Sequence, residues 1–511
     1  MFEFAFSLGI YSYLIFFLGI TGRLYPQSVF IVSFLYLVIL IFLIRKRIKK
    51  PKIQLDKFGK LLFALLLVQI LVNLIGALGP ELSFDALWYH LTLPKIFLLN
   101  HSIFYIPGGL LYYSLFPKLG EMLFLAALSV DGEIFAKLIH FIFGILTIVI
   151  TYKISRKILN QNFSLLASLI FSSNLVFSWE STTAYIDLIR SFFEILTLWA
   201  FLNKDTIRSG ISLGLAISTK LLSLGSLPIF LTLHVLFRRK YFKNIVVFTI
   251  LSILVPLPWL MVSFIKTGNP IYPLFTNYYQ TSINISFFQI IPDTVHLLLK
   301  ADDPISPIYL ITMPLIILSF KKFNQSLKII TIYSLLAILI LYLIPRTGGG
   351  RFILPYLPAF SILVSGTIAV LKFNQLKKLL IILIIFIALA TIGFRSITNY
   401  KYLNIILGRE SKGEFLTKNL NFNFGDFYDV DGFFKQKIKA EDKVLLYGFH
   451  NLYYVNFPFI HESWVKKGDR FKYIATSKDS KLPKKFSFWS LIYYNQTTGV
   501  KVYSLNKEWV Y

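Results

Sequence analysis

The sequence predicts an all-α polytopic membrane protein with about 11–13 transmembrane helices, followed by a small C-terminal α/β domain. The chain has 511 residues, of which 56% are hydrophobic and only 15% charged, and a water-soluble protein of this size is not so apolar. Apolar runs long enough to cross a bilayer recur through the first 394 residues. After them the apolar density falls, and short β-branched and aromatic runs alternate with Gly and Asn turns.

The apolar runs are predicted to be helices because a bilayer contains no water to satisfy an open backbone. The stretch 209–237 contributes two shorter helices with a break around Lys220, which brings the candidate spans to thirteen. The other candidates are residues 4–20, 27–44, 60–78, 133–152, 163–180, 185–203, 243–264, 307–320, 328–345, 352–371 and 377–394.

The placement of the basic residues predicts the orientation of the chain. The formal net charge is +27, and alternate connections hold 23 basic residues against two acidic ones, whereas the opposite connections before the C-terminal tail hold eight basic residues. By the positive-inside rule the first set faces the cytoplasm, so the N-terminus is predicted to be cytoplasmic and residues 395–511 extracytoplasmic. We therefore expect a multi-pass protein of the inner (plasma) membrane, and the basic charge does not indicate nucleic-acid binding.

Three extracytoplasmic segments are predicted. The first loop, residues 79–132, has amphipathic stretches that we expect to form helices lying on the membrane. The second loop covers residues 266–306. The third is the domain 395–511, with strands expected near 443–447, 471–474 and 501–504, and residues 1–394 form the transmembrane domain that we expect to be catalytic.

Carboxylates gather where spans meet the extracytoplasmic side. Glu81 and Asp85 are four residues apart, which would place both on one helical face, and Tyr89 and His90 follow closely. Asp187 begins the sixth span. Such carboxylates could bind a divalent cation, deprotonate a nucleophile, or anchor helix ends at the interface.

Cationic residues are predicted on the same side. Lys220 lies in the break between two short helices, and Arg346 and Arg351 flank a Thr-Gly-Gly-Gly run. Glycines permit close approach of the backbone, and Arg offers a bidentate donor for phosphate. These cations could hold lipid headgroups, pair with the carboxylates, or form a phosphate site. Carboxylates and phosphate-binding cations together point to an anionic lipid substrate.

Six segments, taken in order, resemble the C-type glycosyltransferase (GT-C) superfamily, in particular the bacterial multi-pass enzymes related to protein O-mannosyltransferases and lipid A aminoarabinose transferases. The segments are FDALWYHLTLPK at 84–95, TTAYIDL at 182–188, GLAISTK at 214–220, GNPIYPLF at 268–275, RFILPYLP at 351–358 and LGRES at 407–411. The resemblance implies a GT-C-like fold and transfer of a sugar from a polyprenyl-phosphate carrier to an extracytoplasmic lipid, glycan or protein acceptor, typically with inversion.

The resemblance also implies roles for single residues. Asp85 would act as the base or position the acceptor, and Asp187 would be the second carboxylate of that cluster. Lys220 and Arg351 would hold the phosphate of the donor, with Arg346 as an additional candidate. Membrane lipids complete the expected partners.

Further site residues are expected around this cluster. Many GT-C enzymes have two adjacent acidic residues in the first loop, whereas here Ala86 follows Asp85 and Glu81 would replace the second acid from one turn earlier. A divalent cation such as Mg²⁺ or Mn²⁺, held by Asp85 and Asp187, is therefore left open. Four residues are expected to contact the substrate, namely Tyr89, His90, Asn269 and Tyr272.

Two other functions remain open at this stage. A transporter or flippase of lipid-linked sugars would place its polar residues at mid-membrane on broken helices and often contain repeats, whereas here the candidates lie at helix ends and no repeat is visible. An envelope polysaccharide ligase or polymerase would share the donor chemistry, and the sequence does not separate it from a transferase.

Overall fold

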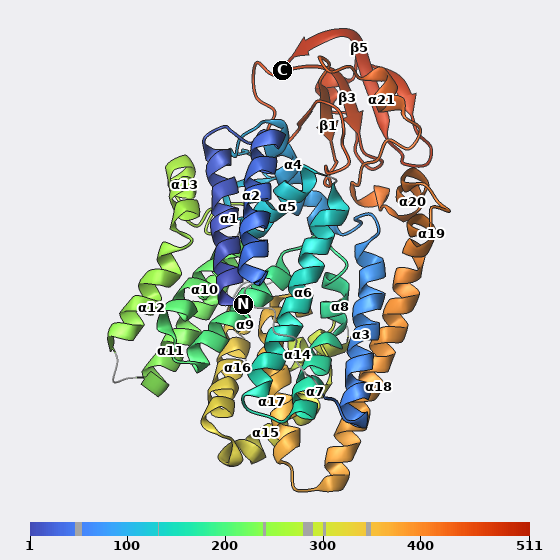
Figure 1. Ribbon diagram of the computed structural model, residues 1–511. Helices are drawn as coiled ribbons and strands as arrows, with labels where there is room; N and C mark the ends of the chain where they lie inside the picture. Colours follow the sequence, from blue (N-terminus) through green and yellow to red (C-terminus); the bar gives the residue numbers. More distant parts are fainter. Residues whose placement is uncertain (46–53, 131, 239–241, 279–289, 300–302, 344–348) are drawn as a thin grey trace.

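Helices build the larger part of the molecule, and a β-sheet formed by the C-terminal residues lies at one end of them (Figure 1). The computed structural model describes residues 1–45, 54–130, 132–238, 242–278, 290–299, 303–343 and 349–511. The helices of the first 406 residues are α1 (Phe2–Ile20), α2 (Pro26–Arg45), α3 (Lys57–Ala77), α4 (Thr92–Leu99), α5 (Leu119–Leu128), α6 (Glu133–Arg156), α7 (Gln161–Ser172), α8 (Leu175–Glu180), α9 (Asp187–Leu202), α10 (Thr206–Thr219), α11 (Ser226–Arg238), α12 (Phe242–Leu254), α13 (Leu257–Thr267), α14 (Ile290–Leu299), α15 (Ile308–Ser319), α16 (Gln325–Leu343), α17 (Leu357–Val370), α18 (Asn374–Asn399) and α19 (Leu403–Ile406).

Six helical segments of the described chain are long and apolar enough to cross a membrane, and a seventh results if the bent pair α12 and α13 counts as one span. The six are Phe2–Ile20, Lys57–Ala77, Glu133–Arg156, Leu221–Arg238, Gln325–Leu343 and Asn374–Ile406. The protein is thus a mostly helical, multi-span membrane protein, as the composition predicts. Fewer helices pass this test than the 11–13 expected from the sequence, because several apolar runs are divided by turns.

One divided run lies at residues 163–180, where the sequence predicts a single span. The structure ends α7 at Ser172 and begins α8 at Leu175. Between them, the side-chain amide of Asn174 donates to the carbonyl oxygens of Ile170 and Phe171, which closes the last turn of α7. A helix end whose carbonyls are satisfied by a side chain can stop inside the protein.

The centre of the bundle is α9, which the sequence predicts as a span at 185–203. All of its residues are buried except Trp199 and Leu202, and it packs against α6 and α10. Its sequence is mostly apolar but includes Asp187, Arg190 and Glu194. A mostly apolar helix suits a protein core or lipid, and the sequence alone cannot distinguish these two environments. In the structure α9 is surrounded by protein.

The first loop forms short helices that pack into the protein. A π-helical turn covers Ala86–His90, α4 follows it, and a 3₁₀ turn at Tyr112–Leu115 precedes α5. The sequence predicts amphipathic helices on the membrane surface here, with 119–130 too short to span. Instead α5 is almost entirely buried and packs against α1, α4 and α6, so it is a core helix and does not lie on the surface.

The C-terminal sheet has five strands in the order β2-β1-β3-β5-β4. The three strands β2, β1 and β3 are parallel, and β5 pairs antiparallel with both β3 and β4. The three predicted strand positions correspond to β1, β3 and β5. The elements are α20 (Lys412–Asn419), α21 (Phe433–Lys437), β1 (Val444–Tyr447), β2 (Phe459–His461), β3 (Arg470–Thr476), β4 (Ser490–Tyr494) and β5 (Lys501–Val510).

The two faces of this sheet belong to different apolar clusters. Val444 and Leu446 on β1 join the same buried cluster as the helical bundle, whereas Leu445 and Tyr447 join a separate cluster. This alternation follows from the two-residue period of a strand. The predicted boundary at 394/395 falls inside α18, which continues to Asn399, and its buried stripe extends through Thr391, Arg395 and Asn399 at helical spacing.

Polar contacts also join the sheet region to the first loop. The ammonium group of Lys95 donates to the carbonyl oxygens of Tyr453 and Val455, each at 2.7 Å, and to the side chain of Asn456 at 2.6 Å. Gly108, with φ +90°, approaches Ser463 so closely that a Cβ atom would lie 1.7 Å from the carbonyl oxygen of Ser463. The C-terminal region is therefore fitted directly onto the first loop.

Candidate active site

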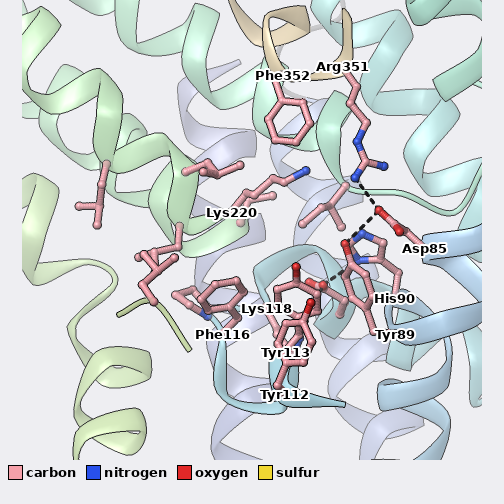
Figure 2. Close-up of a pocket in the computed structure, with 18 of the residues that line it drawn as sticks. Asp85, Tyr89, His90, Tyr112, Tyr113, Phe116, Lys118, Lys220, Arg351 and Phe352 are labelled. Carbon is pink, nitrogen blue, oxygen red and sulfur yellow. Dashed lines mark hydrogen bonds and ion pairs between the residues drawn. The ribbon is translucent and has the colours of Figure 1, made fainter. Parts of the chain in front are cut away.

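A cavity of about 380 Å³ lies where the first loop, the break between α10 and α11, the second loop and the segment before α17 meet (Figure 2). Besides tyrosines, its wall contains six charged or titratable side chains, namely Asp85, His90, Lys118, Glu121, Lys220 and Arg351. Most of the rest of the wall is aromatic or aliphatic. A mostly apolar cavity with a few converging polar groups is the usual form of a ligand site.

The π-helical turn Ala86–His90 positions the residues that the first loop contributes. Two side-chain hydrogen bonds hold this turn in place. The indole of Trp88 donates to the carbonyl oxygen of Leu110 at 2.8 Å, and the hydroxyl of Thr92 donates to the carbonyl oxygen of Leu87 at 2.6 Å. Single π-helical turns often occur at functional sites. Here the turn brings Tyr89 and His90 to the same cavity as Asp85, which immediately precedes it.

Asp85 and Arg351 form an ion pair in the cavity wall (Figure 2). The Nη2 atom of Arg351 lies 2.6 Å from Oδ2 of Asp85, and the hydroxyl of Tyr89 donates to the same oxygen at 3.2 Å. The guanidinium carbon lies 5.2 Å from the ring centre of Tyr185 and 5.6 Å from that of Phe352. Burial by itself lowers the pKa of Arg351. The nearby carboxylates, chiefly those of Asp85 and Asp187, have a larger opposite effect, so the pKa of Arg351 is raised above its usual value. Arg351 is therefore positively charged at any physiological pH.

The glycine before Arg351 lets the backbone come close to the second loop. The amide of Gly350 donates to the carbonyl oxygen of Asp303 at 3.1 Å, and the amide of Arg351 donates to the Asp303 carboxylate at 2.7 Å. A Cβ atom on Gly350 would lie 2.3 Å from that carbonyl oxygen, so a larger residue could not adopt this approach. The prediction that the Gly run permits a close backbone approach holds at this position.

Lys220 and Asp187 form a second ion pair. The ammonium nitrogen of Lys220 lies 2.7 and 2.9 Å from the two carboxylate oxygens of Asp187. Lys220 follows α10 with an extended backbone, and Asp187 is the first residue of α9. Lys220 lines the cavity and is 15% exposed through its side chain, whereas Asp187 is buried behind it with 1% exposure. The predicted break at Lys220 is thus confirmed, and it turns the ammonium group toward the cavity.

A third charged cluster was missed in the sequence. Glu121 lies near the start of α5, and its Oε1 atom is 2.9 Å from Nδ1 of His90. The ammonium nitrogen of Lys118 lies 3.9 Å from the same oxygen. All three side chains are at most 2% exposed and line the cavity. The available signal was the i, i+3 pair of opposite charges inside the otherwise apolar run that begins at residue 115, because ionisable residues in such a run need partners.

Glu81 does not lie where the sequence places it. It precedes the helix that starts at Phe84, so it does not share a helical face with Asp85, and it does not line the cavity. Its carboxylate accepts from the backbone amides of Leu82, Ser83 and Ala184. A carboxylate with these partners fixes the path of the chain ahead of the site.

Two other predicted substrate residues lie outside the cavity wall. The side chain of Asn269 accepts from the amide of Ile271 and donates to the carbonyl oxygen of Leu274, which stabilises the turn of the second loop. Tyr272 is buried, with its hydroxyl 3.4 Å from that of Tyr105. This segment contributes Leu274 and Phe275 to the cavity instead. Arg346 lies outside the described residues.

The described carboxylates do not form a metal site. A divalent cation with oxygen ligands needs several carboxylate or carbonyl groups around one point. Asp85 is bound to Arg351 and Asp187 to Lys220, and no group of three or more potential ligands occurs in the described part of the chain. Because each carboxylate is paired with a cation, no chemical step is assigned to a metal ion.

The fold that contains this cavity is similar to that of a protein of known structure. No protein-family model matches the sequence, and no curated protein sequence matches it. The structure matches that of ArnT from Cupriavidus metallidurans bound to undecaprenyl phosphate with a TM-score of 0.58 and 12% sequence identity, over 88% of this chain and 98% of ArnT. The fold is that of ArnT. The apo state of ArnT gives the same TM-score and identity over 86% of this chain and 97% of ArnT.

The match to ArnT extends over most of this chain and nearly all of ArnT. The mostly helical membrane fold expected from the sequence is therefore one that this chain shares with ArnT. An oligosaccharyltransferase from Archaeoglobus fulgidus, in its apo form, is also similar, at 12% identity over 81% of this chain and 69% of that protein. Its TM-score of 0.43 is too low to add to the argument, so the ArnT match alone supports the fold.

Proposed function

We propose that the protein is a membrane glycosyltransferase that moves a sugar from a polyprenyl-phosphate carrier to an acceptor. The observation that carries the proposal is the convergence of Lys118, Lys220 and Arg351 on one cavity, beside Asp85, in a fold that it shares with a protein crystallised with undecaprenyl phosphate. A lipid phosphate supplies the anion that these cations would bind, and a sugar attached to it supplies the group to be transferred.

The cations would stabilise the leaving group. When the bond between the sugar and the phosphate breaks, negative charge grows on the phosphate, and cations already in place lower the barrier because they need no rearrangement. Arg351 can bind two phosphate oxygens at once through its planar guanidinium, whereas Lys220 acts as a compact charge. Both are held in position by carboxylates, at 2.6 Å and 2.7 Å.

The apolar part of the wall fits the other two portions of such a donor. Its leucine and phenylalanine side chains suit an isoprenoid chain, whereas its tyrosine and tryptophan side chains suit the faces of a sugar ring. The first group is Leu221, Leu222, Leu224, Leu274, Phe275 and Phe352, and the second is Trp88, Tyr89, Tyr112 and Tyr113.

Asp85 has two effects in this scheme. Its carboxylate holds Arg351, and Asp85 lines the cavity into which an acceptor hydroxyl would enter to reach the sugar. Attack from the face opposite the phosphate would invert the configuration at the sugar carbon. When the donor phosphate binds Arg351, the carboxylate of Asp85 would be left facing the sugar and the acceptor hydroxyl. Asp187 contributes through Lys220, since its own carboxylate is buried behind the cavity wall.

The orientation of the protein belongs to the same proposal. With the basic connections on the cytoplasmic side of an inner (plasma) membrane, the cavity opens on the extracytoplasmic side, together with the C-terminal region. The acceptor would then be an extracytoplasmic lipid, glycan or protein. The fit of Lys95 and Gly108 to the C-terminal region places that region beside the loop that builds the cavity, where it could contact the acceptor.

The test uses purified protein in nanodiscs with undecaprenyl phosphate and with a panel of undecaprenyl-phosphate-linked monosaccharides. We expect undecaprenyl phosphate to bind, and Arg351→Ala to weaken its binding at least 10-fold, because one charge-assisted contact contributes about 1.5–3 kcal/mol. Lys418→Ala is the matched control, since Lys418 is an exposed cation paired with Glu410 away from the cavity.

Transfer itself is measured as release of undecaprenyl phosphate from the linked sugar in the presence of envelope extracts as acceptor. Asp85→Asn is expected to leave the protein folded and inserted but to abolish this release. Unchanged release by Asp85→Asn would contradict its role. Movement of the intact linked sugar across proteoliposome membranes, with no release, would instead show a transporter.

A further inference from the structure

His90 and Glu121 form a dyad in the cavity wall that the roles proposed above do not use. The Nδ1 atom of His90 lies 2.9 Å from Oε1 of Glu121, and both side chains are buried. The imidazole is flanked by the rings of Tyr89 and Tyr185, at centre-to-centre distances of 4.1 and 5.6 Å. The ring thus has two aromatic neighbours and is held at one nitrogen by a carboxylate.

The hydrogen bond to Glu121 fixes which nitrogen of His90 carries the proton. A carboxylate accepts hydrogen bonds, so Nδ1 donates and Nε2 presents a lone pair. This Nε2 atom is buried and has no hydrogen-bond partner in the described chain, although His90 lines the cavity. Figure 2 shows its ring beside the pair formed by Asp85 and Arg351. A buried acceptor without a donor inside a ligand cavity indicates that a ligand group supplies the donor.

Three carboxylate oxygens of the two ion pairs are already engaged. The Oδ2 atom of Asp85 accepts from both Arg351 and Tyr89, and both carboxylate oxygens of Asp187 accept from Lys220. An acceptor hydroxyl that enters the cavity therefore finds in Nε2 of His90 a lone pair that no protein group occupies.

The surroundings keep His90 neutral, as a base must be. Burial lowers the pKa of His90, and the hydrogen bond and charge of Glu121 raise it again in part. Among the other groups that face the ring, the carboxylate of Asp85 raises the pKa and the ammonium group of Lys220 lowers it further. The balance lies below the ordinary value, so the imidazole is unprotonated near neutral pH and gains a proton only in acid.

We infer that His90 is the general base of the transfer reaction and that Glu121 is its positioning residue, an inference that rests on the proposed glycosyltransferase function. Nε2 takes the proton of the acceptor hydroxyl as its oxygen bonds to the sugar carbon. The bond from that carbon to the phosphate oxygen breaks, and its electron pair leaves with the polyprenyl phosphate. The proton on His90 then passes to water, and Glu121 stabilises the imidazolium while it exists.

The first experiment compares variants in the undecaprenyl phosphate release assay. His90→Gln is expected to lower kcat by a factor of about 10²–10⁴, the usual contribution of a general base, while undecaprenyl phosphate still binds as in the wild type. His234→Gln is the matched control, because His234 is another buried histidine without a hydrogen-bond partner in the described structure and it does not line the cavity. A kcat of His90→Gln within a factor of three of the wild type would overturn the inference and leave the proposed function intact.

Glu121→Gln tests the positioning role through the pH profile. The wild-type kcat should rise with pH through the pKa of His90. Because the Glu121 carboxylate raises that pKa, its loss should move the acidic limb of the profile to lower pH and reduce kcat on the plateau. A residue with a merely structural role would reduce activity without moving the limb, and that result would overturn the assignment of Glu121.

A readout without turnover checks that the lone pair can be reached. Diethylpyrocarbonate acylates neutral imidazole, and we expect mass spectrometry to find His90 modified at pH 7, more slowly after undecaprenyl phosphate is added. Failure to modify His90 would overturn the inference. Absence of sugar release by the wild type with every donor would instead refute the proposed function, and the base assignment would fall with it.

Discussion

Replacement of Lys220 by methionine removes the cation from one buried ion pair and tests the site and the fold together. The ammonium nitrogen lies 2.7 Å from the nearest oxygen of Asp187, which is 1% exposed. With an effective dielectric constant of about 20, two unit charges at this distance attract by roughly 6 kcal/mol. Part of this attraction offsets the loss of hydration, so removing one partner of such a pair costs about 3–5 kcal/mol.

The assay is thermal unfolding in detergent, followed by intrinsic fluorescence. Lys220→Met should unfold several degrees below the wild type, because Asp187 keeps a buried charge without its partner. The double variant Asp187→Asn/Lys220→Met should recover most of the loss, since no unpaired charge remains. Both variants should bind undecaprenyl phosphate about 10- to 100-fold more weakly, as expected for loss of one charge-assisted contact.

The two readouts separate two errors in the reasoning. A single variant as stable as the wild type would show that the ion pair does not exist in the folded protein. A double variant that is stable and binds undecaprenyl phosphate like the wild type would show that Lys220 is not a phosphate ligand.

The remaining predictions concern the C-terminal region. Gly108→Ala should destabilise the contact between the C-terminal region and the first loop by about 2 kcal/mol or more, because φ is +90° and the new Cβ would collide with Ser463. Gly109→Ala serves as the control, since a Cβ atom there has no contact closer than 3.8 Å. We expect faster proteolysis of the C-terminal region in the Gly108 variant only. Burial lowers the pKa of His461 to about 4, so the unfolded chain binds more protons than the folded one between pH 6.5 and 4, and stability should fall as the pH falls through this range, by up to about 3 kcal/mol. Fluorescence of Trp464, whose ring centre lies 5.0 Å from that of His461, reports this loss, and a His461→Gln variant with the same pH dependence as the wild type would contradict it.

The sequence predicts the class of the protein well because its signals are local. Apolar runs of about twenty residues identify α1, α3, α6, α16 and α18, and alternating β-branched and aromatic residues identify β1, β3 and β5. The number of spans is not predicted well. A short apolar helix such as α5 or α9 has the same sequence pattern whether lipid or protein surrounds it, and only the packing decides.

The candidate site is predicted in part for a related reason. Asp85, Lys220 and Arg351 are polar residues at breaks in apolar runs, which is a local signal. The pairing of these residues has no local signal, since Asp85 and Arg351 are separated by 266 positions and no spacing rule connects them. Glu121 was missed because its spacing from Lys118 gives no indication of the histidine that it contacts.

The contacts of Lys95 with the C-terminal region have a consequence for how the molecule is made. Lys95 and its carbonyl partner on Tyr453 are 358 positions apart. At roughly 5–20 residues per second, the ribosome therefore adds Tyr453 about 20–70 s after Lys95. During that time the first loop has left the ribosome but lacks the surface against which it packs. We expect the nascent chain to expose this loop until the last strands are synthesised, so that translation arrest before β1 would leave an inserted bundle with an unfinished cavity.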